Sequence, residues 1–308
     1  MKIVIDKYIP CLEEVLREEG YEVIALEPNA ITPAAVAEAD ALFVRTRTQV
    51  NKELLNGSTV TFVATATIGT DHIDFDYCQQ HGIKVASAPS CNAQAVCDYI
   101  EEALREVGGT SIGIVGYGHV GKKVAAMAKK RGLEVVINDP PLELIGDVRQ
   151  CDIITFHTPL TKNGPYPTYH LCDTDFLKRC QPNAIIINAA RGGIVDEQAL
   201  LQSGHPFVID CWEGEPRINP EVAQSDRALL VSMHIAGYSL EGKINASQQC
   251  LDAFCQHFSL PALIIDKKVV SLQSQTGDSA PGWLRRVSEQ LQAQPQAFEE
   301  LRKKYVLR

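Results

Sequence analysis

The chain has 308 residues, of which 45% are hydrophobic and 22% are charged, and this ordinary globular composition excludes a disordered or fibrous protein. Its length predicts two domains of roughly 150 residues each. The formal net charge of −9 argues against a broad nucleic-acid surface, because binding a polyanion requires a basic face. The first residues, MKIVID, lack a signal-peptide pattern, and no apolar run is long enough to span a membrane, so we expect a cytoplasmic protein.

Ten cysteines are scattered along the chain, and no two of them have the C-x-x-C spacing of zinc or redox sites. We expect buried thiols that act as small hydrophobic side chains in a reducing compartment, and no metal site.

The first 90 residues predict short strands that alternate with helices. The strands are KIVID, YEVIAL, ADALFVR, VTFVATA and GIKVASA, and a first helix covers PCLEEVLREEG. A helix over 92–107 leads to a second series, SIGIV, a helix from His119 to Lys130, LEVVIND, CDIITFHTP, AIIINAAR, FVIDCWEGE and LLVSMHIAG. Nearly continuous apolar runs of this kind are typical of parallel strands that are buried on both faces.

The order of elements predicts an α/β protein of two domains. We expect a Rossmann-type doubly wound parallel sheet over 93–239, inserted in a second, flavodoxin-like α/β substrate domain formed by 1–92 and 240–266. A helix over 239–258 should return the chain to that domain. Residues 267–308 are expected to form a short C-terminal extension, a polar loop and one charged helix, which is a possible dimerisation element.

A glycine motif predicts the cofactor site. Gly116, Gly118 and Gly121 form G-x-G-x-x-G directly after a strand and at the start of a helix, where the backbone can approach a pyrophosphate. Asp139 ends the next strand, where a carboxylate can bond an adenosine ribose and repel the extra phosphate of NADP. We therefore expect NAD; the alternative is an ordinary turn with Asp139 in a loop.

Three chemically distinct side chains follow strands of the second series. Arg191 follows AIIINAA, Glu215 lies two residues after FVIDCW, and His234 follows LLVSM. Ligands of open parallel sheets bind beyond the carboxyl ends of the strands. Histidine suits the removal of a hydroxyl proton, a carboxylate can orient its ring, and arginine can hold a substrate carboxylate. Each residue taken singly could instead be structural, and their shared position favours catalysis.

These motifs resemble the D-2-hydroxyacid dehydrogenase family. The segments are GYGHVG, NAARGGIVDEQAL, DCWEGEP and HIAG, and the corresponding arginine, glutamate and histidine of that family are catalytic. The narrower segments FVATATIGTDHID, FHTPLTKNGPYPTYHL and HIAGYSLEGK resemble the branch that oxidises 4-phospho-D-erythronate in pyridoxal phosphate biosynthesis.

The resemblance also implies ligand contacts. The residues that it implies for NAD binding are Gly116, Gly118, His119, Val120, Gly121, Asp139, Thr158, Ala189, Ala190, Arg191, Asp210 and Gly237. For substrate it implies Thr46, Thr67, Arg191 and Tyr238. The chain departs from the family in four features. The link ALREVGGTSIGIVG and the turn LLQSGHPFVID are shorter, Met233 stands where the family often has proline, and only about 40 residues follow the catalytic core. A homodimer is expected from the resemblance.

A phosphorylated substrate needs further cations, and Arg45 and Arg47 are the candidates, with Lys243 a weaker one. Their spacing predicts that both arginines lie on one face of a strand; they could equally be solvated. His72 and Asp74 could suggest a metal, but a turn or helix-start role is favoured. Two other functions stay open: another dehydrogenase of the class, such as one acting on 3-phosphoglycerate, and an NAD-sensing binding protein.

Overall fold

The computed structural model describes residues 1–266 and 280–307, and it divides into two compact units. Unit 1 comprises Met1–Asn92 and the described part of Ser239–Gln275. Unit 2 comprises Ala93–Tyr238 and the described part of Thr276–Arg308. Within the described ranges, no helix combines the length and apolar character that crossing a membrane requires.

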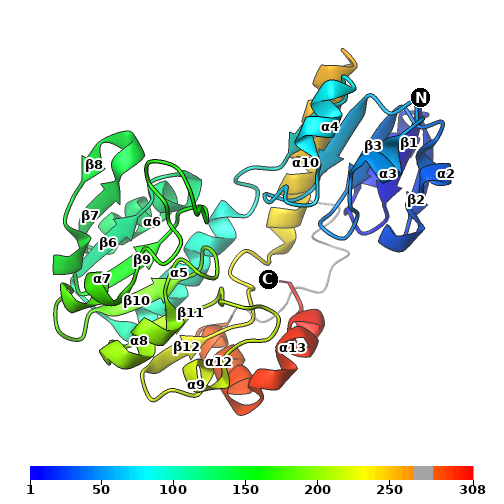
Figure 1. The fold of residues 1–308 in the computed structure, drawn as a ribbon. Helices are drawn as coiled ribbons and strands as arrows, with labels where there is room; N and C mark the ends of the chain where they lie inside the picture. The colour runs from blue at the N-terminus through cyan, green and yellow to red at the C-terminus, as the bar shows by residue number, and fades with distance from the viewer. Residues whose placement is uncertain (267–279, 308) are drawn as a thin grey trace. The chain divides into compact units, whose positions relative to one another are not determined.

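Unit 1 is built on a five-stranded parallel sheet in the order β2-β1-β3-β4-β5, the flavodoxin-like order (Figure 1). Its strands are β1 (Lys2–Asp6), β2 (Glu22–Leu26), β3 (Ala41–Val44), β4 (Phe62–Thr65) and β5 (Lys84–Ser87). Its helices are α1 (Leu12–Glu18), η1 (Pro28–Ala30), α2 (Pro33–Val36), α3 (Lys52–Leu55), α4 (Phe75–Gln80) and α10 (Leu240–His257).

Alternation along the strands gives unit 1 a core on each face of its sheet. Ile3 and Ile5 belong to one buried cluster, which includes Phe254 of α10, while Val4 between them belongs to the other. Successive strand side chains point to opposite faces, so a strand covered on both sides is apolar at most of its positions. The helix expected over 239–258 therefore does pack on the first domain, as α10.

Unit 2 is built on a seven-stranded sheet in the order β12-β11-β10-β9-β6-β7-β8 (Figure 1). Its strands are β6 (Ser111–Val115), β7 (Glu134–Asp139), β8 (Leu144–Ile145), β9 (Ile153–Phe156), β10 (Ile185–Asn188), β11 (Phe207–Ile209) and β12 (Ala228–Val231). All pairs are parallel except β7 with β8, the short strand that the sequence did not predict. The strand order reverses beside β6, which places the topological switch point next to the glycine motif.

The helices of unit 2 cover its sheet. They are α5 (Ala93–Val107), α6 (His119–Lys130), η2 (Pro140–Leu142), η3 (Val148–Gln150), α7 (Thr174–Lys178), α8 (Glu197–Ser203), α9 (Pro220–Ala223), α12 (Trp283–Ala293), η4 (Pro295–Ala297) and α13 (Phe298–Lys304). Helices α5 and α6 contact each other, and so do α7 and α8. Crossovers between parallel strands are right-handed as a rule, so α6 and the pair α7 and α8, which connect strands on different sides of β6, are expected on opposite faces of a doubly wound sheet.

The C-terminal segment differs from the expectation of one charged helix in a separate extension. It forms α12 and α13, and Trp283, Leu284 and Phe298 are buried in the core of unit 2. Pro295 separates the two helices, because proline is tolerated in a first turn and disrupts a helix interior. Helix α12 is therefore amphipathic, and its apolar side packs beside β12 (Figure 1).

Candidate active site

The turn between β6 and α6 has the geometry that each glycine of the motif requires. Gly116 has φ 93°, a left-handed conformation that favours glycine. A Cβ on Gly121 would lie 2.0 Å from the Gly116 carbonyl oxygen, so the helix can approach the strand only without a side chain. A Cβ on Gly118 would meet no protein atom within 4 Å. That open position, at the N-terminus of a 12-residue helix, is where a pyrophosphate can approach the backbone.

Two side chains beside this turn fit a dinucleotide. Asp139 ends β7, and its Oδ2 accepts a hydrogen bond of 2.6 Å from the Tyr117 backbone N–H. The carboxylate therefore faces the turn, as a ribose-binding acid must. Thr158 lies beyond β9, and its buried Oγ1 has no hydrogen-bond partner among the described residues. A buried hydroxyl without a hydrogen-bond partner destabilises the protein, and a ligand that bonds it removes this cost. Asp139 and Thr158 therefore fit a bound NAD.

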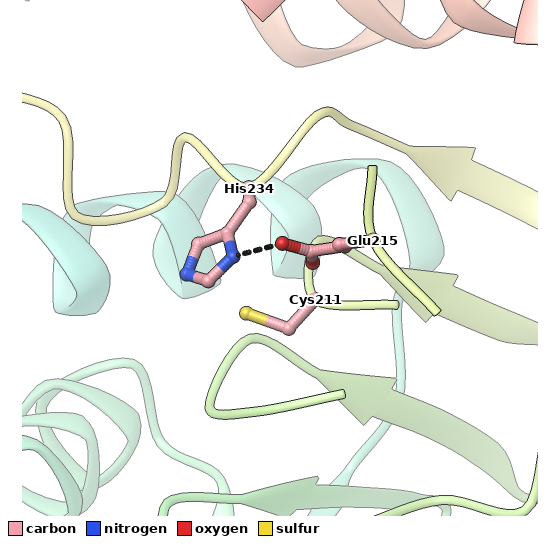
Figure 2. A group of neighbouring side chains, drawn as sticks. All are labelled: Cys211, Glu215 and His234. Atoms are coloured by element: carbon pink, nitrogen blue, oxygen red, sulfur yellow. Dashed lines mark hydrogen bonds and ion pairs between the residues drawn. The ribbon is translucent and has the colours of Figure 1, made fainter. Parts of the chain in front are cut away.

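His234 and Glu215 form a paired base and carboxylate. His234 Nδ1 lies 2.7 Å from Glu215 Oε2 (Figure 2). The other carboxylate oxygen of Glu215 accepts a 2.7 Å bond from the Trp212 backbone N–H. Because an ionised carboxylate only accepts, Nδ1 carries the ring proton and Nε2 is left with a lone pair. The two side chains retain 30% and 20% of their exposure, so the pair is open to a ligand on one side.

Asp210 holds the His234 segment in place. This carboxylate has no exposed surface, and it accepts bonds from the backbone N–H groups of Ile235 at 2.7 Å and Ala236 at 2.9 Å. The Ser232 hydroxyl donates a third bond of 2.7 Å. His234 itself has φ 56°, a strained conformation for a residue other than glycine, and these bonds maintain it. The contact with NAD expected of Asp210 stays a prediction.

Arg191 lies at the same edge of the sheet, after β10. Arg191 is exposed, and its Nη1 donates a 2.7 Å hydrogen bond to the carbonyl of the preceding residue. The following Gly192 permits close contact with the segment after β11, since a Cβ there would lie 1.8 Å from the Trp212 carbonyl oxygen. The ends of β10, β11 and β12 therefore bring Arg191, Glu215 and His234 to one edge of unit 2, as the sequence predicts.

The remaining positions expected near NAD also lie in unit 2. His119 and Val120 begin α6, Ala189 and Ala190 follow β10, and Gly237 and Tyr238 follow His234. Their contacts with cofactor or substrate stay predictions.

Arg45, Thr46 and Arg47 lie in unit 1 and line a cavity of about 220 Å³ with Asp6 and Tyr8. Strand β3 ends at Val44, so the prediction that the two arginines share one strand face is wrong. They lie instead in a turn, closed by a 3.2 Å bond from the Thr48 N–H to the Arg45 carbonyl. The turn nevertheless brings both to one cavity.

Lys243, in the first turn of α10, lies near this cationic turn in unit 1. Burial and the neighbouring charge of Arg45 lower the pKa of its ammonium group. Lys243 is therefore close enough to Arg45 to feel its charge, and it is a further cationic group beside this turn.

Residues of the FVATATIGTDHID segment, at 62–74, make structural contacts within unit 1. The Thr67 hydroxyl, expected to meet substrate, bonds Thr65 Oγ1 at 2.6 Å and the Gly69 carbonyl at 2.8 Å. His72 is buried and lies 3.0 Å from Thr65 Oγ1, and Asp74 caps α4 through the Tyr77 N–H. These contacts match the turn and helix-start roles that the sequence favours.

Another histidine, His157, lies near the glycine turn. Burial lowers the pKa of its imidazole to about 3, so the ring stays neutral at physiological pH. Within residues 1–266 and 280–307, no carboxylate pairs with His157 as Glu215 does with His234, and the His157 Nε2 lies 3.1 Å from the Thr155 hydroxyl. His234 is therefore the better equipped of these two rings for proton transfer.

Sequence reasoning missed two neighbours of this site. The Cys211 thiol lies beside Glu215 and His234, with one ligand atom of each of the three within 4.8 Å of the others (Figure 2). Its position directly after a strand could have singled it out among the cysteines, all of which are free thiols. Arg302 of α13 lies over the Tyr238 ring at 5.4 Å, and its buried Nε has no hydrogen-bond partner in the described part of the chain.

Comparison with known proteins agrees with this geometry. Residues 90–236 match the model of the D-isomer specific 2-hydroxyacid dehydrogenase NAD-binding domain. An erythronate-4-phosphate dehydrogenase of Bacteroides thetaiotaomicron is 40% identical, over all of this chain and 97% of the relative. Another, of Cronobacter sakazakii, is 42% identical over 85% of this chain and 74% of the relative.

Solved structures agree on the fold. An NAD⁺-bound 3-phosphoglycerate dehydrogenase of Entamoeba histolytica superimposes with a TM-score of 0.68, at 23% identity, covering 86% of this chain and 99% of that one. The full-length sequence similarity and the glycine turn together show that the chain belongs to the erythronate-4-phosphate dehydrogenases, within the D-2-hydroxyacid dehydrogenase family, and is an NAD-dependent dehydrogenase.

Proposed function

We propose that the chain oxidises 4-phospho-D-erythronate at C2 to the 2-oxo acid, as a step of pyridoxal 5'-phosphate biosynthesis in the cytoplasm. The single observation that carries the chemistry is the 2.7 Å pair of His234 and Glu215 at the strand edge that also holds Arg191. The names of the full-length relatives support the choice of substrate.

In this proposal some residues of the chain bind the substrate and the cofactor, and others transfer the proton. Arg191 binds the substrate carboxylate with its planar fork of donors and polarises the oxygen on C2. His234 Nε2 takes the hydroxyl proton, and Glu215 stabilises the imidazolium through Nδ1. Bound NAD supplies the hydride acceptor. Asp139 and the glycine turn hold the dinucleotide. Asp210 keeps the His234 segment rigid, so the imidazole does not have to change position before it accepts the proton.

The cavity of Arg45 and Arg47 is proposed to take the substrate phosphate. Two guanidinium groups against the one carboxylate of Asp6 leave a net positive lining, which favours a dianion. Thr46 and Thr67 of unit 1 and Tyr238 of unit 2 are proposed as further substrate contacts. The protein is also proposed to be a homodimer, and its mass in solution by light scattering tests this.

A substrate panel tests the function. The purified protein is given NAD with 4-phosphoerythronate, 3-phosphoglycerate or unphosphorylated 2-hydroxy acids, and NADH absorbance is followed. We expect the highest kcat/KM with 4-phosphoerythronate, because the family segments and the cationic cavity favour a phosphorylated acid of that class. Faster turnover of 3-phosphoglycerate would reassign the substrate, and NAD binding without turnover of any acid would favour an NAD sensor.

A further inference from the structure

The thiol of Cys211 gives the His234–Glu215 pair a third ligand of a different kind. Cys211 follows β11 directly, its side chain is 1% exposed, and its sulfur points toward the ring and the carboxylate (Figure 2). Nothing in the proposed dehydrogenase mechanism uses this sulfur. Thiolate, imidazole and carboxylate together are the ligand types that Zn²⁺ prefers in proteins.

The spacing of the three ligand atoms fits one metal ion. They lie within 4.8 Å of one another, so a point exists no more than about 2.8 Å from all three. Zinc bonds to sulfur are about 2.3 Å, and those to nitrogen and oxygen are about 2.0–2.2 Å. Side-chain movements of less than about 1 Å therefore complete three bonds. The partly exposed His234 and Glu215 leave the fourth position open to water.

We propose that Cys211, Glu215 and His234 form an inhibitory site for a thiophilic divalent cation, with Zn²⁺ as the ion that fits best. Binding replaces the hydrogen bond between His234 and Glu215 with two metal bonds, and it removes the nitrogen lone pair and the carboxylate from catalysis. The inhibition rests on the proposed function of this pair, whereas the metal binding does not.

Metal binding at this site releases one proton, the proton of the Cys211 thiol. Burial, with Asp210 and Glu215 nearby, raises the pKa of the Cys211 thiol well above its usual range, so the free protein holds a neutral S–H. A bound metal ion displaces that proton to solvent, because a coordinating thiol is deprotonated outright. The His234 Nδ1 proton moves to Nε2, so the imidazole stays neutral and presents its Nδ1 lone pair to the metal. The Zn²⁺ charge is then balanced by one thiolate and one carboxylate.

Cobalt(II), an optical substitute for zinc, tests the binding without any substrate. Reduced, chelator-free protein is titrated with Co²⁺, and we expect one equivalent to produce a thiolate-to-cobalt band in the near ultraviolet that Zn²⁺ abolishes. Cys211→Ala should lose the band. The matched control is Cys172→Ala, because Cys172 is another fully buried thiol of unit 2, and this variant should keep the band.

The inhibition is measured separately, with NAD and the best acid of the panel. We expect Zn²⁺ to inhibit the wild type reversibly, with EDTA restoring the rate and Mg²⁺ without effect. Cys211→Ala, or Cys211→Val if alanine destabilises the fold, should need at least about tenfold more Zn²⁺. A wild type without the cobalt band, or variants at Cys211 with unchanged zinc sensitivity, would overturn the proposal. A protein inactive on every acid but with the cobalt band would refute only the proposed function.

Discussion

Alanine at Gly121 and alanine at Gly118 are chemically identical changes that the structure predicts to have different effects. At Gly121 the new Cβ would lie 2.0 Å from the Gly116 carbonyl oxygen, so the start of α6 must move away from β6 by about 1.4 Å to reach an ordinary contact. Overpacking of this kind costs about 1–3 kcal/mol of unfolding free energy, and it also distorts the turn that receives the pyrophosphate. At Gly118 the Cβ meets no protein atom within 4 Å.

Urea unfolding and NAD titration of both variants separate these effects. We expect Gly121→Ala to lower the unfolding midpoint and to weaken NAD binding. Gly118→Ala should unfold within about 0.5 kcal/mol of the wild type and still bind NAD about tenfold or more weakly, because the new methyl group would take the space proposed for the pyrophosphate. If Gly121→Ala matched the wild type in both measurements, the reasoning from helix-to-strand contact would be refuted.

Five further variants test other parts of unit 2. His234→Ala should reduce kcat by at least about a hundredfold while the NAD dissociation constant stays nearly unchanged, and full activity would remove His234 from the mechanism. Asp139→Ala should raise the use of NADP relative to NAD, and a wild type that already prefers NADP would contradict this role of the carboxylate. Asp210→Asn leaves one backbone N–H of the His234 segment facing an NH₂ group, so we expect a loss of about 2–4 kcal/mol in urea unfolding together with a lower kcat. Ser232→Ala removes only one of the bonds to Asp210 and should lose less. Burial raises the pKa of the Glu197 carboxyl from its usual value of 4.5 to about 7. Between pH 4.5 and about pH 7 the folded protein therefore binds a proton that the unfolded chain has lost, and the stability of the folded state falls as pH rises through this range. Glu197→Gln should flatten that slope in unfolding midpoints measured at pH 5 and pH 8, and an unchanged slope would assign the pH dependence to other groups.

The sequence by itself determined the element order and much of the site. Strands β1 and β6 could be identified from KIVID and SIGIV because a strand covered on both faces is a nearly continuous apolar run. The convergence of Arg191, Glu215 and His234 could be predicted because the carboxyl ends of parallel strands share one edge of the sheet. Both inferences need only local pattern and a general rule of topology.

Only the tertiary structure decided which side chains contact one another. The turn after Val44 moves Arg45 and Arg47 off the strand, and the core of unit 2 takes in Trp283 of the C-terminal segment. The Asp210 carboxylate reaches backbone groups 25 and 26 residues further along the chain, and the Cys211 sulfur meets His234. Such contacts depend on rotamers and on the separation of neighbouring strands, which packing fixes and residue periodicity does not encode.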